Sequence, residues 1–240
     1  MASVRTATPK ATVTTFTGSG TNSVEVALGV TSPDILIFYL TYPLTSGKFY
    51  KNSTGTAQRA FMLFDGDFTR GYYSDLRTLT SSSGSLSLAS SARLEYQNSV
   101  LSFPNSTSTF KSGAVYKCIA VEKGAPNATI TDIVGNGTTN VTADIGISNP
   151  KHLVIYATAP LSTGKYVSSS SAQRAFGLMD LDSDSIRQLY ANIKNSTSSF
   201  DFMGVTTLKQ IGYENGDVIF GVSGSTPSRN NYAYRVIAIE

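Results

Sequence analysis

The side chains that most often carry chemistry are scarce in this chain, and the scarcity excludes several kinds of site. A Ser-His-Asp hydrolase needs a histidine as its base, and the 240 residues hold one, His152. A zinc site of the usual kind needs several cysteine or histidine ligands, whereas Cys118 is the only cysteine. Because Cys118 falls inside an apolar run, we expect no thiol nucleophile there. The sequence therefore favours a protein that is not an enzyme, with no cofactor and no metal.

One acidic motif resembles the opening of a calcium loop. It runs Asp180-Leu-Asp-Ser-Asp184, but Ser185 and Ala191 stand where such a loop has its glycine and its final glutamate. Carboxylates are also common at helix N-termini, where they accept from free backbone N–H groups. We therefore expect Asp182 or Asp184 to cap a helix rather than to bind calcium.

Two arginines occur in the same five-residue word, Ala-Gln-Arg-Ala-Phe. The word spans residues 57–61 and 172–176 and contains Arg59 and Arg174. An arginine at a strand start can pair with a carboxylate such as Asp65 or Asp180, or it can donate to backbone carbonyls. We favour a structural role for both arginines over a ligand-binding role.

The chain contains a long internal repeat. Residues 11–48 align with residues 128–165 at a constant offset of 117 without a gap, and 16 of the 38 aligned positions are identical. Both segments end in a loop of the form Pro-Leu-x-x-Gly-Lys, which lacks the first glycine and the final Ser or Thr of a phosphate loop. The repeat indicates two copies of one domain. Chemistry built into an ancestral domain should appear in both copies, and His152 fails that test because Ile35 stands at its place in the first copy.

Short apolar runs predict strands in each copy. They are bounded by Pro or Gly and are too short for core helices. The runs Ile35–Leu40 and Leu153–Ala157 are continuously apolar, which predicts central strands buried on both faces. Further strands are expected at 12–17, 23–28, 59–64, 115–121, 174–179 and 234–239. In the strand at 115–121, Tyr116, Cys118 and Ala120 should face one way and Lys117, Ile119 and Val121 the other.

The middle of each copy has a different spacing. Ile186, Leu189, Tyr190 and Ile193 fall at i, i+3, i+4 and i+7, which predicts a helix with one apolar stripe. Tyr72, Tyr73 and Leu76 match this stripe in the first copy. The expected fold is therefore mainly β: a tandem duplication of a sandwich or barrel domain of about seven strands, each with one short helix.

The domain boundaries follow from the repeat. We expect an N-terminal arm at 1–10, a first β-domain at 11–122, a linker at 123–127 and a second β-domain at 128–240. The arm carries Arg5 and Lys10 and no acid; we favour a disordered terminus, and an assembly role for the two cations is the alternative.

Charge and hydropathy exclude some partners. Only 15% of residues are charged and the net charge of +3 is spread thinly, so we expect no nucleic-acid binding. The first residues lack the apolar core of a signal peptide, and no run approaches the length of a membrane span. We expect a protein that is made in a host cytoplasm and works outside it, without a membrane partner.

Ser, Thr, Asn and Tyr dominate the polar positions, and the sequence predicts neither a disulfide nor an export signal. This combination resembles the composition of bacteriophage virion structural proteins of the decoration, coat or tail type. The resemblance covers the style of the whole chain and implies a structural component localised to a virion. Its partners would be further copies of itself and other virion proteins. One form is a ring of three chains that presents six similar domains.

Two other functions remain open. Tyr-rich and Ser-rich loops at 66–75, 80–92, 104–112 and 222–232 would suit a receptor- or carbohydrate-binding β-sandwich module. An all-carboxylate glycosidase site is the third possibility.

Overall fold

The computed structural model describes twelve stretches of the chain. They are residues 8–42, 47–48, 58–76, 87–89, 94–104, 107–159, 164–165, 173–181, 187–193, 204–206, 211–221 and 227–240. Arg5, Asp182 and Asp184 lie outside them. We call residues 8–122 the first half and residues 123–240 the second half.

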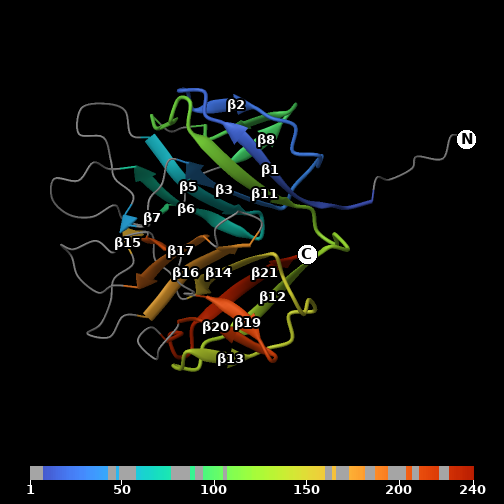
Figure 1. Ribbon diagram of the computed structural model, residues 1–240, viewed down its shortest axis with the longest axis vertical. Helices are drawn as coiled ribbons and strands as arrows, with labels where there is room; N and C mark the ends of the chain where they lie inside the picture. Colours follow the sequence, from blue (N-terminus) through green and yellow to red (C-terminus); the bar gives the residue numbers. More distant parts are fainter. Residues whose placement is uncertain are drawn as a thin grey trace, which may run out of the picture.

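Two large sheets form the centre of the molecule (Figure 1). The first has the order β1-β11-β3-β5-β6-β7-β15, and β10 adds to β5 in parallel. Its strands are β1 (Ala11–Thr17), β3 (Ile35–Tyr42), β5 (Gln58–Asp65), β6 (Phe68–Leu76), β7 (Ser87–Ala89), β10 (Thr109–Phe110), β11 (Val115–Val121) and β15 (Gly164–Lys165). The second has the order β12-β21-β14-β16-β17-β18-β4. Its strands are β4 (Gly47–Lys48), β12 (Ala128–Val134), β14 (His152–Ala159), β16 (Gln173–Asp180), β17 (Arg187–Ile193), β18 (Gly204–Thr206) and β21 (Ala233–Ile239).

A three-stranded sheet covers the outer face of each large sheet. In the first half it consists of β2 (Ser23–Glu25), β9 (Val100–Ser102) and β8 (Glu95–Gln97), and in the second half of β13 (Asn140–Thr142), β20 (Asp217–Ile219) and β19 (Gly212–Glu214). Both outer hairpins turn on two residues with positive φ, Asn98-Ser99 and Asn215-Gly216. This geometry belongs to the tight turns that match the twist of a hairpin.

Each large sheet is completed by a strand from the other half. The strand β15 of the second half pairs with β7, and β4 of the first half pairs with β18. Both added strands are the Gly-Lys ends of the repeated loop, whose preceding residues 43–46 and 160–163 lie outside the described stretches. The two halves therefore exchange equivalent strands reciprocally.

The central strands are buried on both faces, as expected from their apolar runs. Every residue from Ile35 to Leu40 is at most 2% exposed, and every residue from Leu153 to Ala157 is 0% exposed. One face of β3 carries Phe38, which packs on Phe16, Phe103 and Phe110 beneath the small sheet. The other face carries Tyr39, which reaches the second half. A single apolar layer thus lies between the two large sheets, where the rings of Phe61 of β5 and Phe176 of β16 pack against each other at a tilt.

The predicted helices are wrong. Residues 187–193 form β17, which pairs antiparallel with β16, and Tyr72, Tyr73 and Leu76 lie in β6. A strand covered on both faces carries apolar side chains at neighbouring positions, so a helical spacing arises in it by chance. Tyr72 points at the other half while Tyr73 packs on Arg59 beneath the small sheet. No helix occurs among the described residues, and none of them could therefore cross a membrane as a long apolar helix.

Candidate functional site

The buried carboxylates of the described residues lie at two points in the layer between the large sheets. Each point is built around the last residue of an equivalent strand, Asp65 of β5 and Asp180 of β16. These aspartates are 1% and 0% exposed. Because an ionised carboxylate in such a place needs partners, the contacts of each aspartate show what it does. We call the two groups the Asp65 cluster and the Asp180 cluster.

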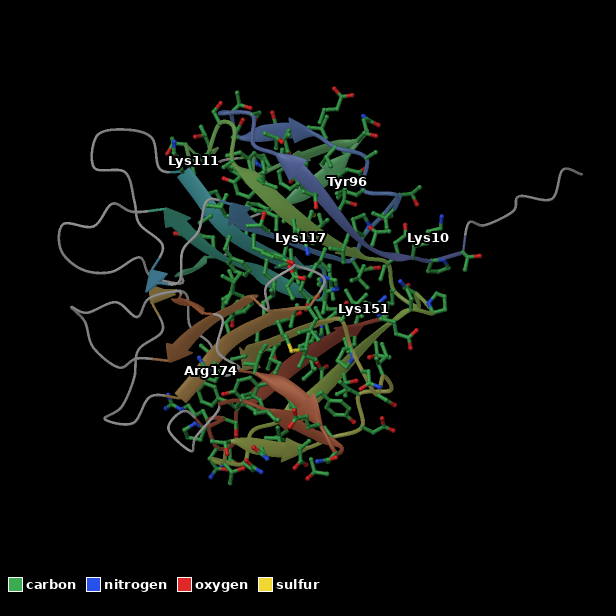
Figure 2. The ribbon with its side chains drawn as sticks, in the orientation of Figure 1. Lys10, Tyr96, Lys111, Lys117, Lys151 and Arg174 are labelled. Atoms are coloured by element: carbon green, nitrogen blue, oxygen red, sulfur yellow. The ribbon has the colours of Figure 1, made fainter. Side chains whose placement is uncertain are left out.

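The Asp180 cluster joins one acid to three donors. The phenol of Tyr39 donates to Asp180 Oδ2 at 2.9 Å, and the ammonium of Lys117 lies 3.0 and 2.8 Å from the two carboxylate oxygens. His152 Nε2 lies 3.2 Å from Asp180 Oδ1. Tyr39 and Lys117 come from the first half and His152 from the second, and Lys117 sits between the halves in Figure 2.

Charge balance within this cluster favours an ionised acid. Burial by itself would raise the pKa of Asp180, but the hydrogen bonds from His152 and Lys117 and the positive charge of Lys117 outweigh it. They hold the pKa of Asp180 well below its usual range. Asp180 and Lys117 therefore form a buried ion pair that links the halves.

The Asp65 cluster repeats this arrangement with the halves exchanged. Tyr156 donates to Asp65 Oδ2 at 2.6 Å, and Arg235 Nη1 donates to the same oxygen at 2.6 Å. Arg235 also forms two bonds to Asp132, of 2.8 and 3.1 Å, and contacts Asp67 at 3.5 Å. Burial and the charge of Asp65 raise the pKa of Tyr156, so this phenol stays neutral and donates.

These contacts place His152 and Cys118 in structural surroundings. His152 is 1% exposed and faces Asp180 across β14 and β16. Cys118 is fully buried on the outer face of β11, and burial raises the pKa of its thiol. Within the described stretches no group of three potential metal ligands occurs.

Arg59 and Arg174 lie on the opposite side of their sheets from the clusters. Arg59 Nη2 donates to Ser108 Oγ at 2.9 Å and its guanidinium lies 4.2 Å from the centre of the Tyr73 ring. Arg174 Nε donates to the carbonyl of Phe220 at 2.9 Å. They are 5% and 1% exposed. Asp65 and Asp180, which the sequence offers as their partners, instead bind cations from the other half.

A tyrosine hydroxyl also binds the backbone carbonyl of each arginine. The phenol of Tyr116 donates to the carbonyl of Arg59 at 2.9 Å and accepts from the N–H of Lys111 at 2.8 Å. In the second half Tyr234 makes the same two contacts with Arg174 and Arg229, at 2.8 and 2.9 Å. These bonds tie the start of β5 or β16 to the loop before β11 or β21.

The remaining sequence candidates lie near the edges of the molecule. Lys10 is exposed, and its N–H donates to the carboxylate of Glu122 at 2.9 Å. The expected loop at 66–75 is mostly β6, and residues 80–86, 90–92 and 222–226 fall outside the described stretches. Within 104–112, Thr109–Phe110 form β10.

An open cavity of about 470 Å³ lies beside the first small sheet. Its walls include Pro33, Leu36, Phe64, Glu95 and Tyr96. The phenol of Tyr96 accepts from the N–H of Leu28 at 3.1 Å. The cavity thus offers a mixed apolar and polar wall with one carboxylate.

Comparisons with protein-family models, curated proteins and solved structures gave no match to this chain.

Sequence reasoning missed the two clusters, although three signals point to them. Tyr39 and Tyr156 are one of the identical pairs of the repeat, and the strands 58–65 and 173–180 both end in aspartate. Lys117 and Arg235 are the lone cations of two otherwise uncharged closing strands. None of these signals indicates that each acid contacts the cation of the other half.

Proposed function

We propose that this chain is a non-enzymatic structural subunit of a virion-like assembly, built as a tandem duplication of one β-domain and working together with further copies of itself and with other virion proteins. The observation that carries the proposal is the interlocking of the halves. Ion pairs at both buried aspartates, two phenol–carboxylate bonds and two strand pairings cross between them. Such a subunit is suited to transmit load without bending between its domains.

The use of the reactive side chains supports a structural role. The histidine, the cysteine and the two arginines of the repeated word are buried within the fold. Breaking a buried ion pair costs several kcal/mol, so the pairs Lys117–Asp180 and Arg235–Asp65 stabilise the unit that would be repeated in an assembly. Closed symmetric oligomers are the usual outcome when such units associate, and a ring of three chains would present six similar domains.

The test combines the mass of the purified protein with its location. We expect light scattering to give a species larger than one chain, and mass spectrometry to find the chain in virion-sized particles purified from the source culture. A monomer at all concentrations that is also absent from such particles contradicts the proposal.

The cavity beside β8 favours binding as a second candidate function. A receptor- or carbohydrate-binding module needs an accessible hollow with a few polar groups and apolar walls. A glycan array would test it, with Glu95→Gln as the variant and Glu25→Gln, an exposed glutamate on β2 of the same small sheet, as the control. Binding that is lost with Glu95→Gln and kept with Glu25→Gln supports this function, and a blank glycan array together with a negative cell-binding assay contradicts it.

A further inference from the structure

The free edge strands of the two large sheets differ in a way that bears on self-association. Among the described residues β1 pairs only with β11, and β12 pairs only with β21. Figure 1 shows β1 and β12 at the margins of their sheets, on the side away from the exchanged strands. An edge strand carries unpaired backbone groups that can add another strand.

Hydrogen bonds at both ends of β1 establish which of its backbone groups point outward. The backbone N–H of Glu122 donates to the carbonyl of Lys10, and the backbone N–H of Gly18 donates to the carbonyl of Ala114. The N–H and C=O groups of the even-numbered residues therefore point toward β11. Alternation in an antiparallel ladder then directs the N–H and C=O groups of Val13, Thr15 and Thr17 away from the sheet.

The beginning of this outer row is already paired. The side-chain amide of Asn127 accepts from the N–H of Ala11 at 3.1 Å and donates to its carbonyl at 2.9 Å, as a neighbouring strand would. The rest of the row, from Val13 to Thr17, has no further strand beside it among the described residues.

β1 lacks the bulges, prolines and charged residues that usually prevent an edge strand from pairing with another chain. All seven residues pair with β11 in unbroken register, without a bulge, and the strand contains no proline and no charge. In β12 the position equivalent to Thr15 is Asp132, whose side chain is 61% exposed. Two β12 strands paired about this position would set like charges opposite each other, which is unfavourable.

We propose that β1 is the edge through which a second copy of this chain binds, as an antiparallel β1–β1 ladder centred on Thr15. This register sets Thr15 opposite Thr15 and Val13 opposite Thr17, and β-branched pairs of this kind stabilise neighbouring strands. The contact continues the first large sheet across a twofold axis. The inference rests on the proposed function, because it names one surface of the proposed self-assembly.

The experiment exchanges one residue between the two edges. Thr15→Asp gives β1 the residue that β12 has at the equivalent place, opposite Lys117 as Asp132 lies opposite Arg235. Circular dichroism and thermal unfolding establish that this variant is folded. The matched control is Thr107→Asp, an exposed threonine in the loop before β10. Sedimentation velocity over a range of concentrations gives the mass of each protein.

We expect the wild type and Thr107→Asp to reach at least twice the 25.5 kDa of the chain, and Thr15→Asp to have half the mass of the wild type. Amide hydrogen exchange supplies a second measurement. Protection of Val13, Thr15 and Thr17 should rise with concentration, while protection of Ile130, Asp132 and Val134 should not.

The possible failures separate the two proposals. An oligomer whose mass is unchanged by Thr15→Asp, or whose concentration-dependent protection lies on β12, overturns the β1 ladder and leaves the proposed assembly role standing. A wild type that is monomeric throughout overturns the ladder, and absence from virion-sized particles then decides against the proposed function as well.

Discussion

The Asp180 and Asp65 clusters have the same plan and different surroundings. Both join an aspartate at the end of a strand to a tyrosine and a cation of the other half. Asp180 has His152 as a further neighbour, and its Lys117 side chain is 14% exposed. Arg235 instead extends from Asp65 to Asp132, which is 61% exposed. Both clusters thus share an acid, a phenol and a positive charge. They differ in that only the cation of the Asp65 cluster also binds an exposed carboxylate.

The largest effect should come from removing the acids one at a time. Asp180→Ala leaves the buried ammonium of Lys117 without its carboxylate, and we expect the free energy of unfolding to fall by about 3–5 kcal/mol. Asp65→Ala should cost about half as much, since Arg235 keeps Asp132 and Asp67. Urea denaturation of both variants measures the difference, and equal losses would show that the clusters are equivalent.

The second-largest effect should be a loss of stability at acidic pH, through protonation of Asp180. The pKa of Asp180 is lower in the folded chain than the value of about 3.9 for an unfolded aspartate. Its contribution is therefore complete above about pH 5 and is lost as the pH falls below about 4 toward the folded-state value. Unfolding free energies between pH 2 and pH 7 should fall less steeply toward acid in Asp180→Asn than in the wild type. Parallel curves would argue against an ionised Asp180 as the link.

Replacing the cation of the open cluster should have a smaller effect. Arg235→Lys keeps the charge but cannot hold Asp65 and Asp132 with separate nitrogens, and we expect a loss of about 1–2 kcal/mol. Asp132→Asn is the control, because an exposed ion pair contributes only about 0.2–1 kcal/mol. If thermal and urea unfolding find no cost for Arg235→Lys, the fork geometry of the guanidinium is unimportant.

The smallest effect should come from replacing His152 with the residue at the equivalent position of the first half. His152→Ile installs the residue found at position 35 and removes one neighbour of Asp180, while Tyr39 and Lys117 remain. We expect a loss of about 1 kcal/mol, the lower end of the cost of removing one hydrogen-bond partner from a buried group that keeps others. A loss as large as that of Asp180→Ala would make His152 a principal member of the cluster.

The sequence predicted the strands well where burial follows a simple pattern. The runs Ile35–Leu40 and Leu153–Ala157 became β3 and β14, and the alternation around Cys118 has the predicted faces, with Tyr116 toward Phe38 and Lys117 toward Asp180. The error lies at β6 and β17, which are covered on two sides by different layers, so neighbouring positions such as Tyr72 and Tyr73 are both apolar.

The clusters could not be derived from the same patterns. Periodicity reports which side chains share a face, and it correctly set Lys117 apart from Cys118. It does not report what lies against that face, and the partner of Lys117 is 63 residues away in the other half. Arg59 and Arg174 show the converse, since their shared word is visible in the sequence but does not indicate that their contacts, such as Ser108 and Phe220, lie away from the clusters.

The reciprocal strand exchange has a consequence for how the chain folds as it is synthesised. The ribosome releases β7 long before Gly164–Lys165, and releases β4 long before β18, so neither large sheet can be completed from its own half. Contacts between residues so distant in the chain form slowly because the intervening segment must first be ordered. The nascent first half therefore carries an open sheet margin until much of the second half has emerged, and this interval is when it is most exposed to aggregation and to chaperones.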